Sequence, residues 1–488
     1  MLRATTRHAG WLVALIAIAS GCAGTGTSGD GTGGSGEQVP GEPTAYPCTE
    51  AGIRQAVEDG GGPHSFLCDG PETIVLEQTI DIVKDVVLDG ERNLTVDGVD
   101  AGVAFAVGGG LEYEILEIDV ELRNMTVARS TIVGNRAFDK LTLRACTVTE
   151  SGERAILTLS DLRIEGSTIS NNAGGGVDHA GRDLIIRESV ISGNGGIGGI
   201  AFWGISGWIV DTVIEDNVAD YEFSGGGITN FGGNLVVALG VVRGNESEQG
   251  GGIYNAGTLS LSASTVQDNS AIEGGGVYNA DPHLPDDPTR AINLLFVSHS
   301  TLSENSADIG GGLYSAGLWQ RLENSTVSGN SAESGAGLAI FGTQEGASSI
   351  TLANVTVTEN DGPAITATGS SVEVRAIGTI VEGVCDDGAE AASWLSRGGN
   401  LESPGDACRF HDETDQASVS AQSLALGPLS DNGGPTLTHM LGTGSAAIDA
   451  MDQADCRESL GEVALDQRLL GRRSDGRCDT GSIEAESQ

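Results

Sequence analysis

The sequence predicts an all-β protein, folded as a right-handed, single-stranded parallel β-helix of about a dozen coils at roughly 25 residues each. Three observations predict this solenoid: a repeated unit, short runs in which apolar and polar residues alternate, and a glycine-rich composition. Of 488 residues, 75 are Gly and only 4% are aromatic. Such a composition is typical of many short strands joined by tight turns.

The repeated unit has the form Ser-Thr-Val-x-x-Asn, a polar turn, then Gly-Gly-Gly-Ile-Tyr-Asn. A unit of this size cannot bury its apolar face alone, so successive units must stack on one another. Asn suits a corner of the coil, since it tolerates left-handed backbone and its amide can bond along the stack. A β-propeller is the runner-up, but its blades need longer repeats of about 40 residues. The predicted corner residues, on average about 27 residues apart, are Asn172, Asn194, Asn217, Asn245, Asn269, Asn305, Asn330 and Asn360.

The first 46 residues predict an export signal and a tether. Residues 1–22 combine a basic start, a short apolar run and an Ala-Ser-Gly-Cys motif that resembles a bacterial lipobox. They predict a lipoprotein signal peptide with Cys22 as the lipidated residue; ordinary signal cleavage is the alternative. Residues 23–46, rich in Gly, Ser and Thr, predict a flexible tether. Ala23 follows the cysteine, which by resemblance to sorted lipoproteins favours the outer membrane. We therefore expect an exported outer-membrane or cell-surface lipoprotein that touches the membrane only through its lipid.

The cysteine spacing predicts disulfides, because the chain is expected to be exported. With Cys22 set aside for lipid, six of the other seven cysteines form local pairs separated by 20, 23 and 22 residues. Cys146 lies in a strand-like run and is predicted to be a small buried hydrophobe. Zinc binding is the competing interpretation, but neither a CxxC spacing nor a neighbouring His supports it. The predicted pairs are Cys48 with Cys68, Cys385 with Cys408, and Cys456 with Cys478.

Two further units follow the tether. Residues 47–384 predict the β-helix with a short N-terminal capping helix, for which Thr49 is the expected N-cap and Ile53 and Val57 form the buried face. Regular coils are expected from about residue 73 to residue 382. Residues 385–488 predict a C-terminal module stapled by two disulfides. This module could continue the last coils or cap them as a separate unit, and we expect a cap.

Several motifs resemble those of secreted bacterial β-helix proteins. The run from Cys48, Cys-Thr-Glu-Ala-Gly-Ile-Arg-Gln-Ala-Val, resembles their start, and the Gly-Gly-Gly-Ile-Tyr-Asn units resemble pectate-lyase-like and polymorphic outer-membrane repeat proteins. Later motifs resemble the closing module of "choice-of-anchor Q" proteins. This resemblance implies a surface β-helix with no established reaction. Members generally carry an anchor after the module, whereas this chain stops at Gln488, so the lipobox would supply the anchor. The closing motifs occupy residues 427–439, 444–450, 466–468 and 478–484.

The charge balance excludes several partners. With 25 Lys and Arg against 68 Asp and Glu, the formal net charge is −43. Nucleic acid is excluded as a ligand, because phosphate contacts need basic side chains. An anionic membrane surface is disfavoured for the same reason. The acidity would keep a rod-shaped molecule soluble, and we expect a monomer.

Aligning the Gly-Gly-Ile runs predicts a column of outward side chains. Tyr254, Tyr278 and Tyr314 fall at this position on three consecutive coils. Aromatic faces with nearby hydroxyls suit sugar rings, so a glycan or polysaccharide is the predicted ligand, and an insertion at residues 281–290 is expected to overhang the column. The alternative is aromatic stacking that only stabilises the sheet. The predicted ligand-binding residues are Tyr254, Tyr278, Tyr314, Thr229 and Asp178.

Catalytic and metal-binding signals are weak. Glu215 and Arg243 are the only candidates for a lyase-type acid/base pair, and a cross-rung ion pair is the favoured interpretation. The motifs of pectate lyases and polygalacturonases are missing, and the seven histidines show no paired metal spacing. We therefore predict no cofactor and no metal site, with Ca²⁺ between stacked carboxylates as an alternative.

Two functions from different classes remain. The preferred one is a non-enzymatic, lipid-anchored surface β-helix that binds or adheres to glycans or envelope partners through the tyrosine column. The alternative is a polysaccharide lyase or hydrolase acting on acidic polysaccharide in a groove along the β-helix.

Overall fold

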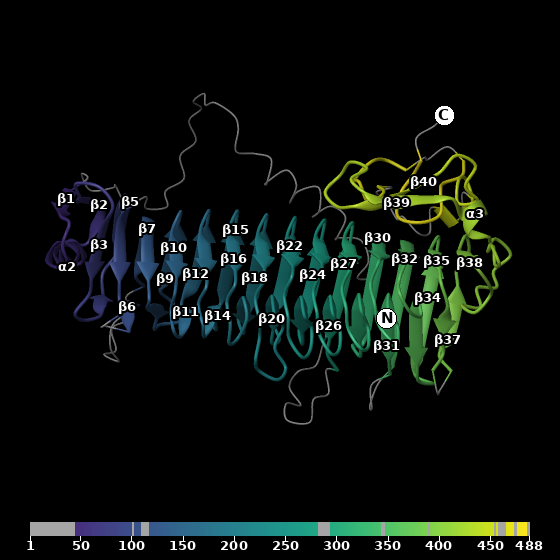
Figure 1. The fold of residues 1–488 in the computed structure, drawn as a ribbon, viewed down its shortest axis with the longest axis horizontal. Coiled ribbons are helices and arrows are strands. Elements are labelled where there is room, and N and C mark those ends of the chain that lie inside the picture. The colour runs from purple at the N-terminus through teal and green to yellow at the C-terminus, as the bar shows by residue number, and fades with distance from the viewer. Residues whose placement is uncertain are drawn as a thin grey trace.

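The computed structural model describes residues 44–99, 102–108, 117–281, 293–342, 347–388, 391–452, 455–456, 465–472 and 476–485. Within these ranges the chain forms a parallel β-solenoid of about 14 turns, so the predicted fold class is confirmed (Figure 1). The predicted signal peptide, Cys22 and most of the tether lie outside the described residues. At roughly 4.8 Å per turn the rod is about 65 Å long.

The turns contribute strands to two sheets that wrap around one core. The 13-stranded sheet takes one short strand from each of 13 turns. The 25-stranded sheet takes the other one or two, and in β5, β7, β30 and β32 these two are joined into a single long strand. All pairings within both sheets are parallel. The strands of the 13-stranded sheet are β4 (Ile80–Ile82), β6 (Val103–Val107), β8 (Thr131–Gly134), β11 (Arg154–Thr158), β14 (Gly175–His179), β17 (Ile200–Phe202), β20 (Ile228–Asn230), β23 (Ile253–Asn255), β26 (Val277–Asn279), β29 (Leu313–Ser315), β31 (Leu338–Phe341), β33 (Ile365–Thr368) and β36 (Cys385–Asp386).

The 25-stranded sheet covers the rest of the circumference. Its first strands in each turn are β1 (Thr44–Pro47), β2 (Gly61–Leu67), β5 (Val86–Asp97), β7 (Asp119–Ala128), β9 (Lys140–Arg144), β12 (Asp161–Glu165), β15 (Asp183–Arg187), β18 (Ser206–Val210), β21 (Asn234–Ala238), β24 (Thr258–Ser262), β27 (Leu294–Ser298), β30 (Trp319–Ser328), β32 (Ser348–Thr358), β34 (Val372–Ile377) and β37 (Ser393–Ser396). The second strands are β3 (Glu72–Val75), β10 (Thr147–Thr149), β13 (Thr168–Ser170), β16 (Val190–Ser192), β19 (Val213–Glu215), β22 (Val241–Arg243), β25 (Thr265–Gln267), β28 (Thr301–Ser303), β35 (Ile380–Glu382) and β38 (Leu401–Ser403).

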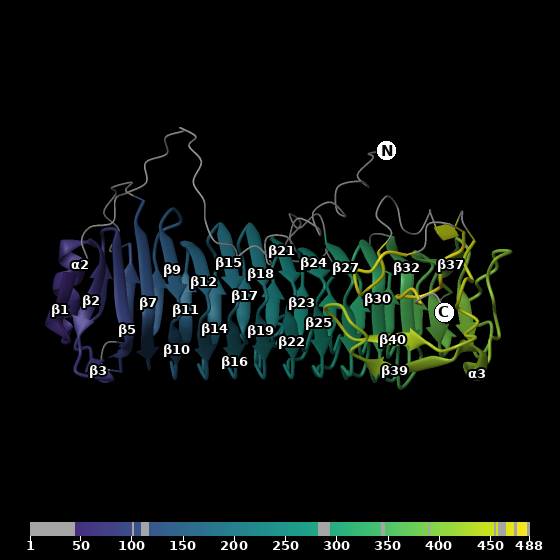
Figure 2. The same ribbon diagram turned by 90° about the horizontal axis from the view of Figure 1, so that it is seen from above.

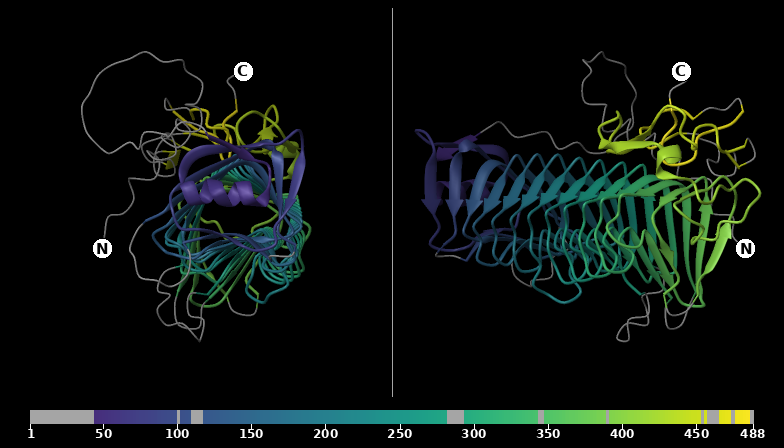
Figure 3. Two further views of the ribbon diagram at one scale, coloured as in Figure 1. Left: turned by 90° about the vertical axis from the view of Figure 1, so that its left-hand side faces the viewer. Right: turned by 45° about the vertical axis from the view of Figure 1, so that its right-hand side comes forward.

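The N-terminal end is capped by the helix α2 (Glu50–Asp59), which lies across the open end of the solenoid (Figure 3). Thr49 is its N-cap, since its hydroxyl accepts a hydrogen bond from the N–H of Gly52 at 3.1 Å. Ile53 and Val57 are buried, as predicted. The predicted tether ends earlier than expected: β1 begins at Thr44 because this segment pairs in parallel with β2.

All three predicted disulfides are present. The first joins Cys48 to Cys68, whose Cα atoms are 5.0 Å apart. Cys48 directly follows β1 and Cys68 directly follows β2, so this bond links the C-terminal ends of two paired strands. Both cysteines are partly buried and pack against the core. The disulfide therefore holds the capping helix, which begins just after Cys48, to the first turn.

The predicted corner asparagines form one continuous ladder inside the solenoid. The Nδ2 group of Asn245 donates to Oδ1 of Asn269 at 2.9 Å and to the carbonyl of Ile214 at 3.0 Å. Its own Oδ1 accepts the side-chain and backbone N–H groups of Asn217. The same pattern repeats at each step from Asn172 to Asn360. Each buried amide is therefore satisfied by the next turn, which fixes the register of the stack.

Cys146 lies in a second ladder, made by small polar residues. Its N–H donates to the hydroxyl of Ser167, whose own N–H donates to Ser189 one turn further. The thiol donates to the carbonyl of Leu122 at 3.2 Å, and burial raises its pKa to about 11. Cys146 is thus the buried small residue that the sequence predicted.

The end of the solenoid differs from the prediction. Strands β36, β37 and β38 pair with β33, β34 and β35, so the coils continue to Ser403 rather than ending at residue 384. The solenoid therefore has more turns than the predicted dozen, because turns at both ends pair regularly without carrying the Asn and Gly-Gly motif. The disulfide between Cys385 and Cys408 closes this last part.

The remaining C-terminal residues do not cap the end of the rod. They form the short helix α3 (Ala421–Leu424) and an antiparallel pair, β39 (Leu426–Ser430) and β40 (Thr438–Leu441). Figures 1 and 2 show this module folded back along the flank of the last turns. It lies over the second strands of the 25-stranded sheet, where Nε2 of His439 is 2.8 Å from the hydroxyl of Ser328.

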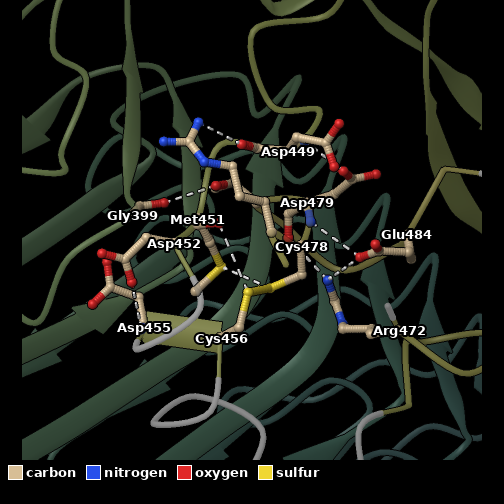
Figure 4. The surroundings of a disulfide bond; sticks show 12 residues. Gly399, Asp449, Met451, Asp452, Asp455, Cys456, Arg472, Cys478, Asp479 and Glu484 are labelled. Atoms are coloured by element: carbon tan, nitrogen blue, oxygen red, sulfur yellow. Dashed lines mark hydrogen bonds and ion pairs between the residues drawn. A yellow bond between two sulfur atoms is a disulfide. The ribbon is translucent and has the colours of Figure 1, made fainter. Parts of the chain in front are cut away.

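Buried polar side chains join the C-terminal module to the solenoid. The Nε2 group of Gln467 donates to Thr301 Oγ1 and to the carbonyl of Ser300, and its Oε1 accepts from Thr326. Arg472 is buried and donates to Asn324 of β30 and to carbonyls of the module. Beside it the disulfide between Cys456 and Cys478 packs on Met451 (Figure 4). The closing motifs therefore attach the C-terminal module to the solenoid, which explains why their polar side chains are buried.

Replacing Asn245 with Ala tests the ladder. The change removes hydrogen bonds to both neighbouring turns and leaves buried amides unsatisfied, so the free energy of unfolding should fall by about 3 kcal/mol. Urea unfolding followed by circular dichroism measures it. Asn234→Ala, at an exposed strand position, is the matched control and should change stability by less than about 0.5 kcal/mol. Equal effects of the two variants would contradict a structural role for the ladder.

His299 predicts acid sensitivity of the docked module. It is buried under the module, and its carbonyl accepts a hydrogen bond from the Thr436 hydroxyl. Burial lowers the pKa of the imidazole to about 4. Arg472 lowers this pKa further, whereas Glu323 and Asp466 raise it. The imidazole takes up its proton more readily when the module is released, so stability present above about pH 6.5 should decline as the pH falls toward 4. The loss attributable to this one group is on the order of 3 kcal/mol.

Unfolding midpoints near pH 7 and near pH 5 check this expectation. His299→Gln should shrink the difference between the two midpoints. His411→Gln, at an exposed site, should leave it unchanged. If neither variant alters the pH dependence, His299 is not the sensitive group.

Candidate functional site

The predicted outward column lies on the 13-stranded sheet, in one register. Tyr254 pairs with Tyr278, and Tyr278 with Tyr314. The residue before each of these points into the core and is fully buried, as predicted. The predicted outward column is present in register as Asp178, Ala201, Thr229, Tyr254, Tyr278, Tyr314, Ala339 and Thr366.

The three tyrosine rings stack along the rod. The ring centroids of Tyr254 and Tyr278 are 5.3 Å apart, and those of Tyr278 and Tyr314 are 4.6 Å apart, with interplanar angles of 10° and 9°. Phe341 continues the stack beyond Tyr314 at 5.0 Å. Phe231 lies 6.3 Å from Tyr254 on the other side, and Trp203 stacks on Phe231 at 3.6 Å. We call these six rings the aromatic stripe: Trp203, Phe231, Tyr254, Tyr278, Tyr314 and Phe341.

The stripe carries one ring per turn over six consecutive turns, because large and small residues alternate between two outward positions. Where the first outward position is Tyr, the residue two further on is Ala. Where the first position within these six turns is Ala or Thr, the residue two further on is aromatic. Trp203, Phe231 and Phe341 were not predicted, because the alignment of the Gly-Gly-Ile runs marks only the first outward position. The complementary pairs are Ala201 with Trp203, Thr229 with Phe231, Tyr254 with Ala256, Tyr278 with Ala280, Tyr314 with Ala316, and Ala339 with Phe341.

Two of the predicted ligand-binding residues are inaccessible. Tyr254 is 1% exposed and packs with Ala256, Ala280 and Tyr278. Thr229 is 0% exposed, and its hydroxyl accepts the N–H of Gly225 at 2.8 Å. Both point away from the core, as expected, but neither side chain can contact a soluble ligand. Their assignment as ligand contacts is therefore wrong for this conformation.

Tyr278 and Tyr314 are half-buried, and their hydroxyls are hydrogen-bonded to each other. Burial raises the pKa of both phenols, that of Tyr314 to about 12. They remain neutral at physiological pH and present ring edges and hydroxyls rather than a charge. The insertion predicted to overhang them, residues 281–290, lies outside the described residues except for Asp281.

The exposed end of the stripe is Trp203, which follows β17 and is 51% exposed. Asp178, one turn earlier, interacts with the indole and forms an ion pair with Arg154 at 2.8 Å. Burial raises the pKa of the Asp178 carboxyl, and both partners oppose that rise. Asp178, a predicted ligand residue, thus lies beside the most accessible ring of the stripe.

Glu215 and Arg243 form the cross-rung ion pair that the sequence favoured. They are partners in the ladder between β19 and β22. Nε and a terminal nitrogen of Arg243 both contact Oε2 of Glu215, at 2.8 and 2.6 Å. The pair lies on the 25-stranded sheet, whereas the aromatic stripe lies on the 13-stranded sheet. A guanidinium held by its own carboxylate is poorly placed to act as a base.

Metal and membrane signals were sought in the part of the chain that the structure describes. No group of three or more His, Cys, Asp or Glu side chains there could hold a metal ion. None of its helices is long and apolar enough to cross a membrane. The Ca²⁺ alternative and the lipid anchor both stay predictions.

Comparisons with known proteins add no relative. No family model, no curated protein and no solved structure matches the chain.

Proposed function

We propose that this protein is a lipid-anchored bacterial surface β-helix that binds glycans without turning them over. The observation that carries the proposal is the aromatic stripe, one ring per turn on the outside of the core, with an accessible end at Trp203. Aromatic rings beside hydroxyl and carboxylate groups suit the apolar faces and polar edges of sugars. The resemblance of the closing motifs to choice-of-anchor Q proteins is part of this proposal.

The binding function is favoured over the alternative of a polysaccharide lyase or hydrolase. A lyase needs a base beside its sugar site, and the sequence offered only Glu215 and Arg243. These two residues neutralise each other on a different sheet from the stripe. The net charge of −43 also repels the acidic polysaccharide that such a lyase would act on.

Incubation of the full chain with insoluble cellulose, with chitin and with soluble polygalacturonate plus Ca²⁺ tests the proposed function. We expect co-sedimentation with at least one neutral polysaccharide. We also expect no rise in the ultraviolet absorbance of unsaturated ends in the polygalacturonate sample. Cleavage of polygalacturonate would favour the alternative of a lyase. If the protein binds none of the three polysaccharides, the proposal of glycan binding is wrong.

The lipid anchor makes a separate prediction. Cys22→Ser should release the protein from the membrane fraction, because no other cysteine follows the predicted signal peptide directly. Immunoblots of membrane and soluble fractions measure this. Cys146→Ser, a buried substitution within the small-residue ladder, is the control and should leave the distribution unchanged. Retention of the Cys22 variant in the membrane would contradict lipidation.

A further inference from the structure

Among the described residues the stack of rings ends at Trp203, so none of their rings covers the second face of the indole. Trp203 stacks on Phe231 with a 13° interplanar angle, and that contact covers the face toward the C-terminal turns. The described residues provide no aromatic partner on the other side. The exposure of Trp203, 51%, is the highest of the six rings.

Ala180 is the residue on the preceding turn that lies next to the free face of the indole. Backbone ladder bonds set this alignment: the N–H of Ala180 donates to Thr158, and that of Trp203 donates to His179. Ala180 is exposed and has only a methyl group. One turn further back, Leu159 occupies the equivalent position and is 48% exposed.

The spacing suits one inserted ring. Two turns separate Trp203 from Leu159, which amounts to about 9–10 Å along the rod. A sugar ring over Ala180 needs contacts of roughly 3.5–4.0 Å on each side, so it fits between the indole face and the Leu159 side chain. The outward position beside Ala180 is Asp178, which supplies a polar edge.

The charges around this position are paired. Asp178 pairs with Arg154 at 2.8 Å, and Arg182 pairs with Asp161 at 2.9 Å. The carboxylates can accept hydrogen bonds from sugar hydroxyls and the guanidinium groups can donate them, while Asp183 and Glu117 add negative charge near Arg182. An anionic sugar is repelled by these carboxylates and by the acidic chain as a whole.

We propose that the free face of Trp203, with Ala180 as the floor and Asp178 and Arg154 at the edge, binds one uncharged pyranose ring of a glycan. The assignment rests on the proposed function and names its ligand class and its site. The pyranose stacks on the indole, and its hydroxyl groups bond to the Asp178–Arg154 pair.

Titration of the full chain with cellohexaose, followed by tryptophan fluorescence and by calorimetry, tests the proposal. Trp203→Ala should weaken binding by about tenfold, while Trp203→Phe keeps a stacking ring and should stay within about threefold of wild type. Asp178→Asn should also weaken binding. Phe341→Ala, at the other end of the stripe, is the matched control. Circular dichroism of each variant checks that the solenoid is folded.

The outcomes separate this site from the broader proposal. If cellohexaose binds wild type and Trp203→Ala equally well, the site is wrong and glycan binding stands. If polygalacturonate binds and cellohexaose does not, the ligand class is wrong. If wild type binds no saccharide by either method, both proposals fail.

Discussion

The structure depends on one constraint: buried polar groups of each turn must be satisfied by the turn beside it. Asn217, Asn245 and Asn269 illustrate this, since each amide donates to the next and accepts from the previous one. A shift of register would leave several amides unpaired in a low-dielectric interior. The ladder therefore fixes which residues stack outside the core as well as inside it. The aromatic stripe follows from that register rather than from any local preference of its rings.

The same constraint explains the closing module. Thr301 and Thr326 occupy equivalent outward positions on successive turns, and Gln467 bonds to both. Outward hydroxyls in a column offer a repeated set of donors and acceptors, so the module docks on the flank through polar contacts as well as through apolar packing on Ile377 and Ile380. The ion pair of Arg468 with Asp466 is buried within this module. The described part of the module docks on the last turns of the 25-stranded sheet, whereas the aromatic stripe lies on the 13-stranded sheet.

The sequence predicted the parts of the fold that repeat, because the Asn ladder and the glycine turns leave a local signature. It could not predict the terminal turns, where β2 and β37 pair in register without that signature. The site was predicted only in part. Trp203 was missed because the ring moves by two residues between turns, and the burial of Thr229 depends on the loop that brings Gly225 onto it. Such contacts join residues at different positions of the repeat or in loops, so alignment of one position of the repeat cannot reveal them.

Stacking decides where an aromatic stripe can take a ligand. Rings in the interior of the stack, such as Tyr278, present only their edges, because both faces are covered by neighbours. Only the two terminal rings keep a face, and the two ends differ. Phe341 is followed in register by Thr368, a branched and half-buried side chain, whereas Trp203 is preceded by Ala180. The end with the small neighbour also has a carboxylate and a guanidinium at its edge, so apolar stacking and polar recognition coincide at one place on the rod.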